Sequence, residues 1–337
     1  MASFDIAMLW AFIIAFAVFM YVVMDGFDLG IGMLFPLFPH KQDRDVMMNT
    51  VAPVWDGNET WLVLGGGGLM AAFPLAYAIL MPAIYTPIIA MLIGLVFRGV
   101  AFEFRWRTQS ERNRWDIAFA GGSLVAAMAQ GIALGAILQG VAVEGRHYAG
   151  GWWDWLTPFS LLTGFAVVAG YGLLGATWLV MKTTGDLRDQ AYRLSLWLLV
   201  ATLVAIVAVS LATPFLQADY WRRWFAWPNI LFTAPIPVAV AAITLVLLKS
   251  IADKHDYRPF VLSLVLFAIT YAGLGVSMYP YIVPQSVTIW QAAAPANSLG
   301  FMIYGVAILV PVILAYTAWA YWVFRGKVHA DSGGYHS

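Results

Sequence analysis

Long apolar stretches follow one another along almost the whole chain, with short polar connections between them. A helix of about 20 apolar residues crosses a hydrocarbon core of about 30 Å. Nine segments have this character, and they cover residues 6–37, 51–80, 82–104, 117–140, 157–181, 194–215, 229–249, 260–281 and 299–324. The pattern predicts an all-α membrane protein, a bundle of about nine transmembrane helices. We expect a single domain over residues 1–327 and a short C-terminal tail over residues 328–337.

Composition agrees with a membrane environment. The chain is 62% hydrophobic and 11% charged, whereas about 25% of the residues of a soluble domain are charged. The net charge is zero, which gives no indication of a nucleic-acid partner, and the absence of cysteine excludes disulfides and thiolate metal sites. No Lys or Arg precedes the first apolar segment and no small-residue cleavage site follows it, so we expect a membrane helix there and not a cleaved signal peptide.

Lysine and arginine are concentrated in alternate connections. Connections near cytoplasmic helix ends carry an excess of these residues, so the N-terminus is predicted to be outside and the C-terminus cytoplasmic. Residues assigned to the cytoplasmic side are Lys41, Arg44, Arg105, Arg107, Arg112, Arg114, Lys182, Arg188, Arg193, Lys249, Lys254, Arg258, Arg325 and Lys327. Those assigned to the outer side are Arg146, Arg222 and Arg223. Tryptophans of the outer connections, at 152, 153, 155, 221, 224 and 227, are expected to be interfacial anchors.

Five charged residues lie inside the predicted helices near their cytoplasmic ends. They are Asp25, Asp28, Asp56, Glu59 and Arg98. A charged group at membrane depth costs several kcal/mol unless it is paired or hydrated, so such residues are candidates for function. Each acidic pair has the spacing i, i+3, which predicts one shared helix face. We expect Glu103 to reach towards Arg105 and Arg107, and we expect no ionisable residue at depth in the fourth to ninth helices.

Four carboxyl groups and one arginine cannot form simple ion pairs. Two interpretations follow: a buried polar network in which Arg98 ties the first three helices together, or a proton path from the cytoplasmic side. In the second interpretation Asp56, with Asp28 as its nearest helper, lines the path. The glycine run at 65–68 lies in an apolar segment and lacks a following Lys-Ser/Thr, so we interpret it as a site of close helix packing.

All five histidines fall outside the predicted helices. They are His40, His147, His255, His329 and His336. A membrane haem of b type needs an axial ligand at depth, which is usually histidine. The sequence therefore predicts that this chain ligates no haem, and it offers no metal site.

Several motifs resemble subunit II of the cytochrome bd family of quinol oxidases. The two most specific are residues 24–34 (MDGFDLGIGML) and 52–61 (APVWDGNETW), because both are polar at membrane depth. Similar segments follow in the same order along the chain at 97–103 (FRGVAFE), 175–177 (GAT), 182–187 (KTTGDL), 278–281 (MYPY) and 310–319 (VPVILAYTAW). The connection at 216–228 is compact, which favours a short branch of the family; the cyanide-insensitive branch is our candidate.

The resemblance implies a terminal oxidase of the bacterial inner membrane that oxidises quinol, reduces O₂ to water and contributes to the proton-motive force. It implies two haems b and one haem d in a partner, subunit I, and none ligated here. Small single-helix subunits, lipids and a structural quinone are further partners that it implies. The alternatives from the residues alone are a secondary transporter, which would place charges near the bilayer centre, and a purely structural membrane scaffold.

Orientation can be tested directly. If the C-terminus is cytoplasmic, alkaline phosphatase fused to it should be inactive, because that enzyme folds only outside the cytoplasm. High phosphatase activity would contradict the assigned orientation.

Overall fold

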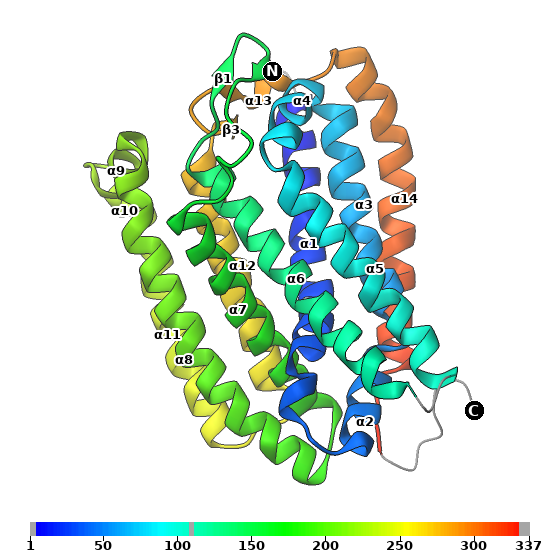
Figure 1. The fold of residues 1–337 in the computed structure, drawn as a ribbon. Helices are drawn as coiled ribbons and strands as arrows, with labels where there is room; N and C mark the ends of the chain where they lie inside the picture. Colours follow the sequence, from blue (N-terminus) through cyan, green and yellow to red (C-terminus); the bar gives the residue numbers. More distant parts are fainter. Residues whose placement is uncertain (1–4, 108–110, 330–337) are drawn as a thin grey trace.

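The computed structural model describes residues 5–107 and 111–329. Within these ranges eight helices are long and apolar enough to cross a membrane, and Figure 1 shows them running side by side. They are α1 (Ile6–Leu34, continued by η1, Phe35–Leu37), α5 (Tyr85–Arg107), α6 (Arg112–Leu138), α7 (Pro158–Lys182), α8 (Gly185–Leu216), α11 (Pro235–Ala252, preceded by α10, Ile230–Thr233), α12 (Arg258–Met278) and α14 (Ala296–Val323). The prediction of an all-α membrane protein is confirmed.

The second predicted segment is broken into two helices, α3 (Trp55–Ala72) and α4 (Pro74–Ala83). Pro74 has no N–H and its ring crowds the preceding turn, so the helix ends before it. Phe73 accordingly leaves helical geometry, with φ −131° and ψ 62°. The carbonyl of Ala72 then accepts a hydrogen bond from the N–H of Ala294 at 2.9 Å. One continuous helix over 51–80 was therefore a wrong prediction; α3 runs along the bundle and α4 lies at its end (Figure 1).

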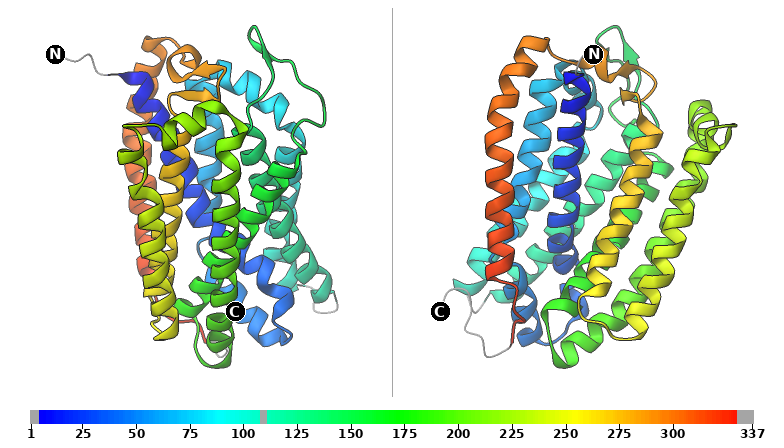
Figure 2. Two further views of the ribbon diagram at one scale, coloured as in Figure 1. Left: turned by 90° about the vertical axis from the view of Figure 1, so that its left-hand side faces the viewer. Right: turned by 180° about the vertical axis from the view of Figure 1, so that it is seen from behind.

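Helix α1 is the centre of the bundle and contacts α3, α6, α7, α12 and α14. Figures 1 and 2 show it between α14 and α3 on one side and α7 and α12 on the other. Its contact with α7 is backbone against backbone: a Cβ added at Gly30 would lie 1.9 Å from the carbonyl oxygen of Tyr171. Small residues permit such close approach in membranes, where apolar burial gives helices little reason to associate.

The glycine run of α3 packs less closely than the sequence suggested. Gly65 and Gly68 face side chains of α1, with a built Cβ 3.2 Å from Val18 and 3.3 Å from Ile14. A Cβ at Gly66 or Gly67 would meet nothing within 4 Å. Half of the run therefore serves helix packing, and the other half lies on an open face.

Short elements that the hydrophobic pattern did not predict lie at the two ends of the bundle. At one end, which we call the basic end, lie α2 (Lys41–Val51) and the connections α7–α8 and α11–α12 (Figure 1). The opposite end carries α9 (Ala218–Phe225), α13 (Ile289–Ala292) and two antiparallel hairpins, β1 (Val143–Glu144) with β2 (His147–Tyr148) and β3 (Tyr281–Val283) with β4 (Val287–Thr288). The connections with most Lys and Arg thus share one end, and the assignment of that end to the cytoplasm stays a prediction.

The last helix is attached mainly by its ends. Only Leu299 of α14 is buried, and its carbonyl accepts from Trp10 Nε1 at 3.0 Å. At the basic end, Lys182 donates to the carbonyl of Phe324, and Lys327 Nζ lies 2.6 Å from Asp256 Oδ2. This hydrogen bond from Lys327 holds the pKa of the Asp256 carboxyl below its usual value. Residues 330–337 of the predicted tail lie outside the described residues.

The approach of α1 to α7 can be tested with Gly30→Ala. The added methyl group must push the helices apart or distort them, which should cost about 1–3 kcal/mol and lower the melting temperature of the purified protein in detergent. Gly121→Ala on α6 is the matched control, because a Cβ there meets nothing within 4 Å. Equal melting temperatures for the two variants would contradict the contact.

Candidate functional site

Arg98 is the centre of a buried ionic cluster near the basic end. Its side chain, on α5, has no exposed surface. Nη1 lies 2.5 Å from Asp25 Oδ1 on α1, and Nη2 lies 2.6 Å from Glu59 Oε2 on α3. The guanidinium also lies 5.8 Å from the centre of the Trp55 ring. One side chain thus joins three helices, as the network interpretation of the sequence predicted.

Asp28 enters the cluster through a neutral residue. Asn58 Nδ2 donates to Asp28 Oδ2 at 2.8 Å, and Tyr321 on α14 donates to Asn58 Oδ1 at 2.9 Å. Asp28 and Asn58 are both buried. Sequence reasoning missed Asn58 and Tyr321; Asn58 lies in the polar run between Asp56 and Glu59, which was the available signal, whereas Tyr321 gave none.

Asp56 is not part of the buried cluster. Its side chain is exposed, and within residues 5–107 and 111–329 it makes no hydrogen bond or ion pair. Residues at i and i+3 differ by about 60° around a helix, which is enough to turn Glu59 inwards while Asp56 stays at the surface. The side chain that contacts Asp28 is Asn58 and not Asp56; the role of Asp56 in a proton path stays a prediction.

A chain of neutral polar groups continues on the other side of Asp25. Tyr21 lies one helical turn before Asp25 on α1. Its hydroxyl accepts from Gln130 Nε2 at 2.9 Å, and Tyr171 donates to Gln130 Oε1 at 2.7 Å. The polar core therefore extends from α3 through α5 and α1 to α6 and α7. Its outer members are tyrosine and glutamine, and the sequence alone does not show whether such neutral residues form a polar network or only pack.

Two buried carboxylate oxygens of the cluster have no partner among the described residues, Asp25 Oδ2 and Asp28 Oδ1. Buried polar atoms are nearly always hydrogen-bonded to protein or water. With one cation for three carboxyl groups, the cluster also has more negative than positive charge. Both features suit a site that takes up a proton or holds water.

Known proteins resemble this chain in sequence and in fold. The sequence profile of the family described as cytochrome bd terminal oxidase subunit II matches residues 6–324. The chain belongs to this family.

Relatives agree with the cytochrome bd assignment, and a solved structure shares the fold. Subunit 2 of the cytochrome bd-I ubiquinol oxidase of Escherichia coli (strain K12) is 32% identical, in an alignment that covers 95% of this chain and 94% of the relative. Subunit 2 of the cytochrome bd ubiquinol oxidase of Bacillus subtilis (strain 168) is 27% identical, covering 95% and 96%. A chain in the structure of the bd oxidase from Geobacillus thermodenitrificans matches the fold with a TM-score of 0.75, at 17% identity over 96% of this chain and 99% of that chain.

Membership of the cytochrome bd family, together with the eight apolar helices, makes this chain a multi-pass subunit of a terminal oxidase in the bacterial inner membrane. The resemblance read from the sequence motifs is confirmed. The family consists of oxidase subunits, so the assignment favours the oxidase interpretation over a secondary transporter.

A second ionic cluster in this cytochrome bd subunit lies closer to the basic end. Arg105 is fully buried, with Nε 2.5 Å from Asp116 Oδ1 and Nη1 2.7 Å from Asp45 Oδ1. Arg44 and Arg112 complete it, at 2.7 Å from Asp116 and 2.5 Å from Asp45. The cluster fixes α2 against α5 and α6.

Of two expectations about this region, the one for Glu103 is confirmed in part and the one for the start of the fourth helix was wrong. Glu103 pairs with Arg107 at 3.6 Å on the surface, whereas Arg105 turns inwards to the acidic residues. Helix α6 begins at Arg112 and not at 117, so its first turns bring the buried Asp116 into the bundle. An apolar pattern marks where a helix is hydrophobic, and it cannot show that a polar first turn is covered by α2.

Arg98→Leu should destabilise the subunit more than it alters chemistry. Removing the guanidinium leaves Asp25 and Glu59 without their cation, at a cost of about 3–5 kcal/mol. We expect loss of subunit II from the purified oxidase, measured by gel and by haem content. Arg107→Leu, on the exposed side of the same helix, is the control and should assemble normally. A fully assembled Arg98→Leu complex with slow turnover would contradict this structural role.

Proposed function

We propose that this chain pairs with a haem-bearing subunit I in a complex that oxidises quinol, reduces O₂ to water and contributes to the proton-motive force. The named relatives are subunits of ubiquinol oxidases, which supports quinol as the electron donor. Within the complex, this chain stabilises subunit I, and its carboxyl groups near the basic end form a secondary proton uptake path. The observation that carries the second role is the gradation of exposure from Asp56 to Asp25.

The three carboxyl groups lie in order of depth. Asp56 is exposed, the side chain of Glu59 is 31% exposed, and Asp25 is fully buried in contact with Arg98. Asp56 and Glu59 occupy the first turns of α3, where the positive end of the helix dipole favours carboxylates. Glu59 and Asp25 both contact the guanidinium of Arg98. A proton that reaches Glu59 is therefore separated from the buried Asp25 by one side chain. Asp28 and Asn58 line the other side of this path.

The haems belong, in this proposal, to subunit I: two haems b and one haem d. His40, His147, His255 and His329 all lie in connections at the ends of the bundle, and His336 is outside the described residues. Among the described residues no helix segment that crosses the membrane presents a histidine, so the residues present do not fit an axial haem ligand at depth. Haem supplies the electron transfer and oxygen chemistry when the complex is loaded; this chain supplies packing and polar groups. Three further expectations stay predictions: that a structural quinone binds, that small single-helix subunits join the complex, and that the chain belongs to the cyanide-insensitive branch.

A purely structural role is the second candidate, and the double ion pair of Arg98 favours it. In that case the clusters at Arg98 and Arg105 only hold helices together. The two roles differ in what happens when a carboxyl group is neutralised without loss of shape: the structural role predicts loss of assembly, and the uptake role predicts slow turnover in an assembled complex.

Purification tests the assignment of the complex. Subunit II isolated from cells that lack subunit I should show no haem absorbance, and the co-expressed pair should show b-type and d-type bands and quinol oxidase activity. A b-type spectrum in the isolated chain would overturn the division of haem ligands.

Asp56→Asn and Glu59→Gln test the uptake path. Both variants keep the shape and hydrogen bonding of the side chain but cannot ionise, so haem content should stay near normal while quinol oxidation slows several-fold. The defect should be larger at about pH 9 than at about pH 6, because protons are scarce at the higher pH and their delivery then limits turnover. Glu103→Gln, an exposed carboxyl on α5, is the control. Normal turnover per haem across this range would end the uptake proposal for the variant residue.

A further inference from the structure

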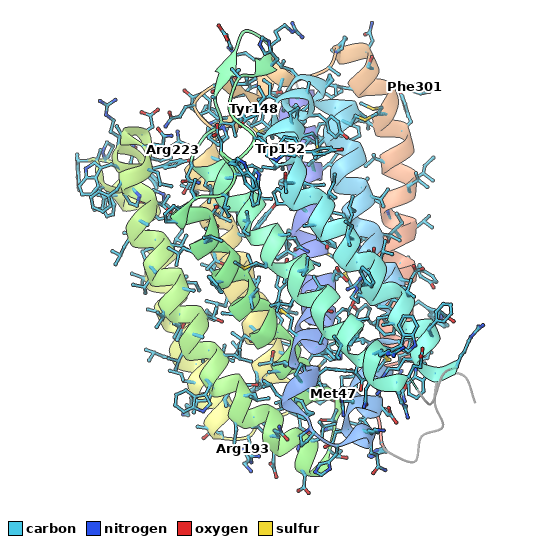
Figure 3. All side chains as sticks on the ribbon, in the orientation of Figure 1. Met47, Tyr148, Trp152, Arg193, Arg223 and Phe301 are labelled. Carbon is cyan, nitrogen blue, oxygen red and sulfur yellow. The ribbon has the colours of Figure 1, made fainter. Side chains whose placement is uncertain are left out.

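A groove of about 650 Å³ opens at the opposite end of the bundle, between α9–α10 and the end of α12. Arg223, Asn229 and Thr233 line one side, and Gly275, Val276 and Tyr279 line the other. Figure 3 shows Arg223 at the same end as Tyr148 and Trp152, far from Arg193 and Met47 at the basic end. The groove therefore lies apart from both ionic clusters.

Arg223 is held in place but not neutralised. Its Nη1 donates to the carbonyl oxygens of Val276 at 3.1 Å and Ser277 at 3.0 Å, in the last turn of α12. These carbonyls orient the guanidinium and offer the partial negative charge of a helix C-terminus. Among the described residues no carboxylate forms an ion pair with Arg223, whereas the adjacent Arg222 lies 4.0 Å from Asp219.

The bonds that Arg223 makes leave much of its donor capacity available. A guanidinium has five N–H groups in a planar fork, and both bonds to α12 use Nη1. Nη2 and Nε can still donate a pair of parallel bonds, the geometry that suits a phosphate. A half-buried cation with a free fork at the mouth of a groove favours an anionic ligand.

The surroundings of the groove are those of a membrane interface. Trp221, Phe225 and Trp227 are exposed around α9, as expected for aromatic residues at headgroup depth. Phe232 is 79% exposed, and Ala272 and Val276 extend the lining along α12. A ligand that fits must therefore combine an anionic group with a long apolar part.

We propose that this groove binds an anionic phospholipid, with the phosphate on Arg223 and an acyl chain along α10 and α12. The net negative charge of the headgroup matches the uncompensated charge of Arg223, and the apolar lining accounts for the chain. A free phosphate would use only the charge of Arg223, and a neutral quinone would use only the apolar lining.

The test uses the purified, delipidated oxidase complex and native mass spectrometry during titration with dioleoyl phosphatidylglycerol. Arg223→Gln should weaken binding of one phosphatidylglycerol by about tenfold, the effect of losing a charge-assisted pair of hydrogen bonds. Arg222→Gln is the matched control, because that side chain is neighbouring, exposed and paired with Asp219; it should bind like the wild type. Dioleoyl phosphatidylcholine should bind more weakly than phosphatidylglycerol to the wild type, and inorganic phosphate should not displace the lipid.

Gly275→Trp is a second variant that leaves Arg223 unchanged. A Cβ at Gly275 meets nothing within 4 Å, and Gly275 lines the groove, so an indole there should occupy the space of the ligand and abolish the tight lipid. The proposal is overturned if either groove variant retains wild-type binding, or if Arg222→Gln weakens binding as much as Arg223→Gln. Equal affinity for phosphatidylcholine, or displacement by inorganic phosphate, would also overturn it.

Discussion

The burial of one guanidinium sets the arrangement of the first helices. A charged group at this depth in a membrane is stable only with partners, and Arg98 takes them from two other helices, Asp25 on α1 and Glu59 on α3. Because both bonds are short and the arginine has no exposed surface, α1, α3 and α5 must meet at one level. The start of α3 is fixed by this requirement, since Glu59 lies in its second turn. Trp55 and Phe102, stacked at 4.7 Å, then close the space beside the arginine.

Close backbone contacts at glycines and the ionic clusters both hold the helices together, each between different helices. Apolar burial cannot hold helices together when the solvent is also apolar, so close packing and polar bonds have to do so. Gly30 lets α1 touch α7, and Arg98 ties α1 to α3 and α5. Arg105 repeats the device nearer the surface, where it joins α2 to α5 and α6. The helices with the largest exposed apolar surfaces, α8, α11 and α14, lie around this core (Figure 2).

The sequence predicted the features that carry a strong signal against an apolar background. Charges inside hydrophobic segments are rare, so Asp25, Asp28, Glu59 and Arg98 could be found from the sequence and assigned to one network. Asn58 and Tyr321 could not, because neutral polar residues are common in membrane helices and only the fold shows which ones meet. Asp56 was misplaced because the spacing i, i+3 fixes an angle around the helix and not which side faces the bundle. Pro74 was a signal in the sequence for the break at Phe73. The hydrogen bond from Ala294 to the carbonyl of Ala72 could not be predicted, because the two residues are more than two hundred positions apart.

Helix α14 gives the buried cluster a connection to the surface of the subunit. Almost all of its length is exposed, and its polar contacts are at Leu299, Tyr321 and the segment that follows Val323. Tyr321 belongs to the same helix as this exposed face. Tyr321 donates to Asn58, and Asn58 donates to Asp28, so two hydrogen bonds separate that face from a buried carboxyl group. Lys327, which follows the helix, contacts Asp256 at 2.6 Å and holds this end of α14 beside the α11–α12 connection. A helix with a single buried residue thus carries a side chain that belongs to the buried polar network.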